Sequence, residues 1–150
     1  MSVEKATYQV LLQDGNFELR RYDPMIVVTS RDSDLAGGNG FNRLFNYISG
    51  NNQDSRQISM TSPVIDTLEG QQSTTSFVMP RQLSMKDVPI PNDPALSPRE
   101  VQGRQVAAIR FSGTVSARTL NEKIDELNEW LEKKKLQPVG AMELARYNPP

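Results

Sequence analysis

The segment GFNRLFNYISGNNQDSRQISMTSPV, residues 40–64, carries most of the structural information in this 150-residue chain. Four apolar residues recur at the i, i+3, i+4 and i+7 spacing of one helical face. They are Phe41, Leu44, Phe45 and Ile48. Gly50 follows, and glycine readily takes the left-handed conformation that ends a helix. The segment therefore predicts a helix over about 40–49, then a polar turn and an extended strand.

Alternating apolar and polar residues near the start predict a β-hairpin. Residues 8–12 and 17–21 alternate on either side of the Asp-Gly-Asn sequence at 14–16, and an Asp-Gly pair between two such runs is a strong hairpin signal. A third strand is predicted over 25–29, where the residues are apolar and β-branched. The polar, glycine-rich residues 32–39 predict a loop before the helix.

The residues after the helix predict three short strands. We expect them over 58–61, 64–67 and 74–79, with Pro63 between the first two. Because proline has no backbone amide to donate, Pro63 predicts either a bulge or a sheet edge at this point. Four prolines within 89–98 then predict an extended connector that is neither a helix nor an inner strand.

Beyond the connector the order of elements repeats. Strands are predicted over 100–101 and 105–111, and a long helix follows. Its apolar face is formed by Leu120, Ile124, Leu127 and Leu131. The helix begins either at Thr119, which has the spacing of a capping box, or at the earlier Ser116. A last strand is predicted over 141–147.

This order of elements predicts the fold class. A hairpin, a helix and strands occur twice, so we expect one α+β domain made of two βαββ-like repeats, at about 6–80 and 99–150, joined by the connector 89–98. The strands would form a strongly curved antiparallel sheet with two helices packed outside it. The second repeat lacks a counterpart of the final strand before Pro150.

The composition excludes several kinds of site. The chain contains no histidine and no cysteine, which removes the commonest ligands for transition metals, a thiolate nucleophile and a disulfide framework. Seventeen basic and eighteen acidic residues give a net charge of −1, whereas general nucleic-acid binding requires a basic surface. No signal-peptide pattern or bilayer-spanning stretch occurs, so a cytoplasmic protein is expected if Met1 is the native start.

Six segments resemble the SOUL haem-binding protein family in their order and spacing. They are YQVLLQDGNFELRRYDP (8–24), GFNRLFNYISGNN (40–52), ISMTSPV (58–64), SFVMP (76–80), VAAIRFSG (106–113) and ARYNPP (145–150). The resemblance covers nearly the whole chain. It implies a distorted antiparallel β-barrel of two βαββ-like repeats with helices packed outside. It also implies an apolar surface groove beside the first helix that binds haem or another tetrapyrrole.

In this sequence, the residues expected at such a groove are Phe41, Arg43, Leu44, Phe45, Tyr47 and Met60. Phe41, Leu44 and Phe45 would form a flat apolar platform, with Phe41 best placed to border the groove. The same stripe also suits a helix packed on a sheet, above all at Phe45 and Ile48. Arg43 would pair with a haem carboxylate, or would be an ordinary exposed helical arginine. Without histidine, the remaining motif ligands for iron are Met60, Met79, Tyr22 and Tyr47. Haem would then be held mainly by shape and apolar contact.

The sequence gives little support for catalysis. Neither a serine–histidine pair nor a cysteine nucleophile can be assembled, and no phosphate-binding loop follows a strand, so an enzyme is not expected. Three functions stay open: a tetrapyrrole carrier or buffer, a small-molecule effector-binding module, and a protein-interaction domain that keeps the fold without binding haem. A strand edge left unpaired near Pro150 predicts a homodimer, unless the chain is naturally short or truncated there.

Overall fold

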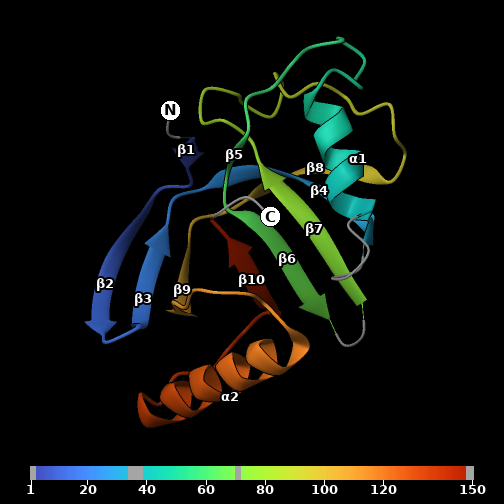
Figure 1. Ribbon diagram of the computed structural model, residues 1–150. Helices are drawn as coiled ribbons and strands as arrows, with labels where there is room; N and C mark the ends of the chain where they lie inside the picture. Colours follow the sequence, from blue (N-terminus) through green and yellow to red (C-terminus); the bar gives the residue numbers. More distant parts are fainter. Residues whose placement is uncertain (1–2, 34–38, 70–71, 148–150) are drawn as a thin grey trace. The chain divides into compact units, whose positions relative to one another are not determined.

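The computed structural model describes residues 3–33, 39–69 and 72–147. These residues form two compact units, each assembled from separate stretches of the chain (Figure 1). Of the described residues, the first unit contains 3–6, 24–33, 39–69, 72–102 and 141–147, and the second contains 7–23 and 103–140. Each unit has its own antiparallel sheet and its own helix.

The first unit is built on a five-stranded antiparallel sheet. Its strands, in spatial order, are β10 (Met142–Arg146), β6 (Val64–Glu69), β7 (Gln72–Val78), β4 (Met25–Ser33) and β8 (Leu96–Val101). A short parallel pair, β1 (Glu4–Lys5) with β5 (Thr61–Ser62), belongs to the same unit.

The strand predicted over 58–61 is wrong for all but its last residue, Thr61, which lies in β5. The backbone amide of Ile58 instead donates to the carbonyl of Ile48 at the end of the first helix, at 2.8 Å. Its side chain is buried in the core. Residues 58–60 therefore connect the helix to the sheet rather than pairing with a strand.

The connector predicted over 89–98 is shorter than expected, because β8 begins at Leu96 and contains Pro98. This strand lies at the edge of the sheet, with β4 as its neighbour on one side. An edge strand tolerates proline, since a position without an amide can face away from the neighbouring strand. The prediction that the proline-rich segment is not an inner strand is confirmed.

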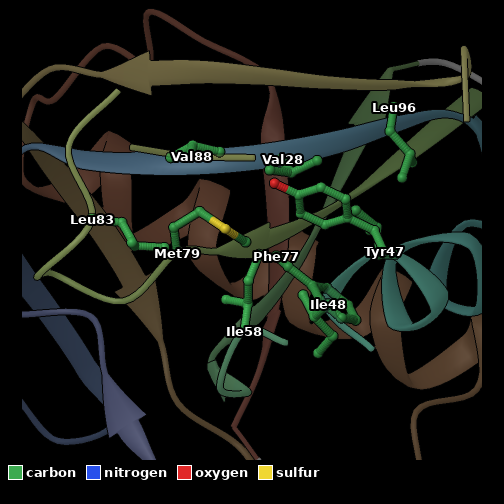
Figure 2. Close-up of a cluster of buried hydrophobic side chains, with 10 residues drawn as sticks. Val28, Tyr47, Ile48, Ile58, Phe77, Met79, Leu83, Val88 and Leu96 are labelled. Carbon is green, nitrogen blue, oxygen red and sulfur yellow. The ribbon is translucent and has the colours of Figure 1, made fainter. Parts of the chain in front are cut away.

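The first helix, α1 (Asn39–Ile48), packs on β4 and β7 (Figure 1). Gly50 follows it with φ of +124°, a conformation that glycine adopts without strain. Within the loop predicted over 32–39, residues 34–38 lie outside the described part, whereas 32–33 extend β4. Below the helix lies the main core, formed by Val28, Leu44, Tyr47, Ile48, Ile58, Phe77, Met79, Leu83, Val88 and Leu96 (Figure 2).

The second unit is a three-stranded antiparallel sheet with one helix. Its strands, in spatial order, are β2 (Tyr8–Asp14), β3 (Phe17–Tyr22) and β9 (Arg104–Ile109). The predicted hairpin is confirmed, and Gly15 supplies the positive φ of +59° at its turn. The helix α2 (Ala117–Lys133) begins after Ser116, whose hydroxyl accepts from the amide of Thr119 at 3.1 Å. Ser116, not Thr119, is therefore the N-cap.

These elements confirm the α+β class, with helices packed on largely antiparallel sheets. Among the described strands, no sheet closes on itself. β10 and β8 end the five-stranded sheet, β2 and β9 end the three-stranded sheet, and β1 and β5 form only a pair. The closed form of the predicted barrel is thus not seen in this part of the chain. The predicted single domain and its two repeats remain predictions. No helix of the described residues is long and apolar enough to cross a membrane.

Candidate functional site

The side chains of α1 point in three directions. Leu44, Tyr47 and Ile48 are buried beneath the helix. Phe41 and Phe45 lie on one flank, one helical turn apart. Arg43 is two positions from both, so it lies about 160° around the helix axis from each of them. The predicted site residues of this helix therefore do not share one surface.

Phe41 and Phe45 form an aromatic surface on their flank of α1. Their rings are stacked with centroids 6.2 Å apart and an angle of 14° between planes. Phe41 also meets Phe77 of β7 edge-on at 5.2 Å, which anchors it to the core. Phe45 is 50% exposed. The pair thus has one ring fixed by the core and a second ring presented to solvent, as a flat apolar platform requires.

The sheet beside this flank carries an arginine that the sequence analysis did not select. Val28, Phe77, Val64 and Arg146 are direct cross-strand partners in β4, β7, β6 and β10. Directly opposed residues in antiparallel strands point to the same face, so Arg146 shares the face of Phe77, on which α1 packs. Strand spacing puts its backbone roughly 10 Å from that of Phe77.

Arg146 is held in a small polar cluster on this face. Its Nη2 lies 3.1 Å from Oδ2 of Asp66, and Oδ1 of Asp66 accepts a hydrogen bond from Thr75 at 2.8 Å. Asp66 and Thr75 are buried, whereas the side chain of Arg146 is 36% exposed. The Nε atom of Arg146 is buried and has no hydrogen-bond partner among the described residues. The guanidinium is thus fixed in position without being enclosed.

Arg43, on the opposite flank, fastens a distant segment to α1. Its Nη1 lies 2.9 and 2.7 Å from the two carboxylate oxygens of Asp93. The amide of Ala95 donates to Asp93, and this bond together with Arg43 lowers the pKa of the Asp93 carboxyl. The contact joins the end of the proline-rich segment to the side of the helix away from Phe41 and Phe45.

Tyr47 lies within the core, and Figure 2 shows its ring among the buried side chains. Its hydroxyl donates to the carbonyl oxygen of Pro89 at 2.7 Å. Burial, aided by the charge of Asp54, raises the pKa of Tyr47 to about 12. A tyrosine binds ferric iron as the deprotonated phenolate, so this environment opposes ligation by Tyr47.

Met60 is partly buried and packs against the main core, and Met79 lies inside it. Among the described residues, no group of three or more acidic side chains could hold a metal ion, and the sequence contains no histidine or cysteine. The side chains of this unit that could contact a haem are those of the aromatic flank and Arg146. None of the four residues considered above as axial ligands of iron is exposed: Met60, Met79, Tyr22 and Tyr47.

Fold and surface together define an α+β protein with an exposed aromatic flank on its first helix. The chain matches the model of the SOUL heme-binding protein family over residues 3–150, and it belongs to that family. It is also similar to heme-binding protein 2 of Homo sapiens, with 39% identity over 61 residues. This match covers 38% of the present chain and 30% of the human protein, so less than a third of that relative is represented.

Proposed function

We propose that this protein binds haem or a related tetrapyrrole on the Phe41–Phe45 flank of α1, and that it carries or buffers this ligand. The observation that carries the proposal is the ring of Phe45, half exposed and stacked on Phe41. Membership of a haem-binding family supports the ligand class. A tetrapyrrole would cover the exposed ring and remove its apolar surface from water.

The other site residues have distinct parts in this proposal. Leu44 and Tyr47 hold α1 on the sheet from beneath, and Met60 borders the same core. Arg146, on the side of the phenylalanines, pairs with a haem carboxylate. Arg43 acts on the opposite flank, where it holds Asp93. Bound haem would supply an iron centre that no histidine of this chain can ligate, which suits a ligand that must be released again.

A haemin titration followed by absorbance in the Soret region tests the proposal. We expect a saturable change with a micromolar dissociation constant or tighter. Phe45→Ala should weaken binding about tenfold, since the ring loses most of its contact with the ligand. Val139→Ala, which trims a fully exposed apolar residue of the second unit, should leave the affinity unchanged. Equal affinities for all three proteins would reject this site.

The carboxylate contact can be tested without altering Asp66. Haemin dimethyl ester keeps the ring and iron but lacks both carboxylates, so the wild-type protein should bind it several-fold more weakly than haemin. Arg146→Gln should remove that difference, whereas Arg43→Gln should preserve it. The reverse pattern would assign the carboxylate to the Arg43 flank.

A further inference from the structure

The second unit contains a pocket of about 420 Å³ that the proposed haem site does not use. It lies between the turn joining β2 to β3, the end of β9 and α2 from Lys123 onward. Its volume falls within the range of about 300–1,000 Å³ that is usual for small-molecule sites. All of its lining residues belong to the second unit, so it is distinct from the flank of α1.

The apolar part of the pocket is built around the only tryptophan of the chain. The ring of Trp130 stacks on Phe17 with centroids 5.3 Å apart and an angle of 2° between planes. Its Nε1 donates to the carboxylate of Asp14 at 3.0 Å, so the indole is fixed and its polar atom is satisfied. Ile109 at the end of β9 completes an apolar lining against which an aromatic ring can lie.

The polar part of the pocket is dominated by lysines. Lys123, Lys133 and Lys134 line it, against two acids, Asp14 and Glu126. Lys123 is paired with Glu126 at 3.1 Å, and Lys134 lies 3.8 Å from Asp14. Lys133 has no ion pair among the described residues. The three lysines exceed the two acids by one charge, and Lys133 is the lysine that no acid of the lining neutralises, while Lys134 lies at the longer distance from its acid.

The position of these lysines has a simpler explanation that must be separated from binding. Lys133, Lys134 and Lys135 stand at the C-terminal end of α2, where positive charge complements the helix macrodipole. Lys135 shares that location, yet it does not line the pocket. It is therefore a matched control for the other two.

We infer that this pocket binds a small aromatic anion, with its ring against Phe17 and Ile109 and its acidic group at Lys133 and Lys134. The apolar lining selects a planar hydrocarbon body, and the excess of lysine selects a negative charge. The site is independent of haem binding at α1 and stands whether or not that proposal holds.

Two dyes test this inference on the intact protein. 8-Anilinonaphthalene-1-sulfonate is an aromatic anion, and N-phenyl-1-naphthylamine has the same aromatic body without the sulfonate. Because Trp130 is the sole tryptophan, quenching of its emission by energy transfer to the dye reports binding close to it. We expect saturable quenching by the anion, with an affinity at least fivefold higher than that of the neutral dye.

The double variant Lys133→Glu/Lys134→Glu should weaken binding of the anionic dye about tenfold and leave the neutral dye nearly unchanged. Lys135→Glu should alter neither affinity. Phe45→Ala should also have no effect, which separates this pocket from the haem site. Equal binding of both dyes by the wild-type protein would overturn the inference, as would an undiminished affinity of the double variant for the anion.

Discussion

The hydroxyl of Tyr47 and the carbonyl oxygen of Pro89, 42 positions apart in the chain, are joined by a buried hydrogen bond of 2.7 Å. This bond fixes the proline-rich segment to the underside of α1. With the Arg43–Asp93 ion pair, it secures that segment at two points on one helix. The flank of Phe41 and Phe45 lies on the other side of α1 from the Arg43–Asp93 contact.

Tyr47→Phe should lower the free energy of unfolding by about 1–3 kcal/mol, because it leaves a buried carbonyl oxygen without its donor. Urea denaturation followed by circular dichroism measures the change. Tyr8→Phe is the control, since Tyr8 contributes its ring to a contact with Arg20 and that ring is retained. Similar losses in the two variants would show that the Pro89 bond is unimportant.

The raised pKa of Tyr47 predicts a dependence of stability on alkaline pH. Its folded pKa is about 12 and its ordinary value is 10.0, so the unfolded chain loses this proton first. The resulting stabilisation is complete below pH 10 and is lost as the pH rises from 10 toward 12. Urea midpoints measured across this range should fall less steeply in Tyr47→Phe than in the wild type. Parallel curves would contradict the assignment.

The Arg43–Asp93 pair should show a coupling of no more than about 1 kcal/mol in a double-mutant cycle with Arg43→Gln and Asp93→Asn, because Arg43 is 39% exposed. The pKa of Asp93 is lowered in the folded protein, so its stabilising effect is present above the ordinary aspartate pKa of 3.8. It is lost as the pH falls through the lowered folded value. A coupling that shows no decrease as the pH is lowered below the ordinary aspartate pKa would contradict an ionic origin.

Asn52→Ala should destabilise the protein by about 2–4 kcal/mol, since three buried or part-buried hydrogen bonds are lost. The Asn52 amide donates to the carbonyls of Tyr47 and Arg56, and its oxygen accepts from the Arg56 amide. The neighbouring Asn51 is exposed, and its side-chain oxygen accepts an exposed hydrogen bond from Asn92, so Asn51→Ala should change stability by less than about 0.5 kcal/mol. Thermal unfolding of the two variants provides the comparison, and equal melting temperatures would refute it.

Breaking the ion pair between Arg20 and Glu18 should lower the free energy of unfolding substantially, because both side chains are buried and lie 2.7 Å apart. Burial alone would lower the pKa of Arg20, but hydrogen bonds with Glu18 and Tyr22 outweigh it and raise the pKa, so the guanidinium stays charged. Arg20→Met should cost about 3–5 kcal/mol by leaving Glu18 buried without its main partner. Arg20→Met/Glu18→Leu should recover much of this loss in urea denaturation, and no recovery would contradict a role for unpaired charge.

Local patterns in the sequence were sufficient to predict most of the helices and strands. The Asp-Gly turn at 14–16 and the apolar stripe of α1 depend on neighbouring residues, so both could be predicted. The irregular backbone at Ile58 could not be predicted, because the Ile58 amide donates its hydrogen bond to the end of α1, ten residues earlier in the chain. The start of β8 at Leu96 was missed for a similar reason, since its pairing with β4 is what makes that stretch a strand.

The candidate site was predicted less completely than the fold. Helical periodicity identifies Phe41, Leu44 and Phe45 as one stripe, but it does not say how wide a face the sheet covers. The structure buries Leu44 and leaves Phe45 half exposed. Arg146 was missed because its position depends on the pairing of β10 with β6. This pairing puts the Arg146 side chain on the sheet face on which α1 packs. No signal within the sequence near Arg146 reveals that register.

The hydrogen bond between Asp14 and Trp130 spans 116 positions, which has a consequence during protein synthesis. At roughly 5–20 residues per second, a ribosome makes Trp130 on the order of 10 s after Asp14. For most of that interval, until Ile109 is made, the β2–β3 hairpin is in the nascent chain without β9, so the edge of β3 can pair with other chains. We therefore expect the amount of correctly folded second unit to depend on the speed of translation and on chaperones at the ribosome exit. The folding of α1 should depend on them less.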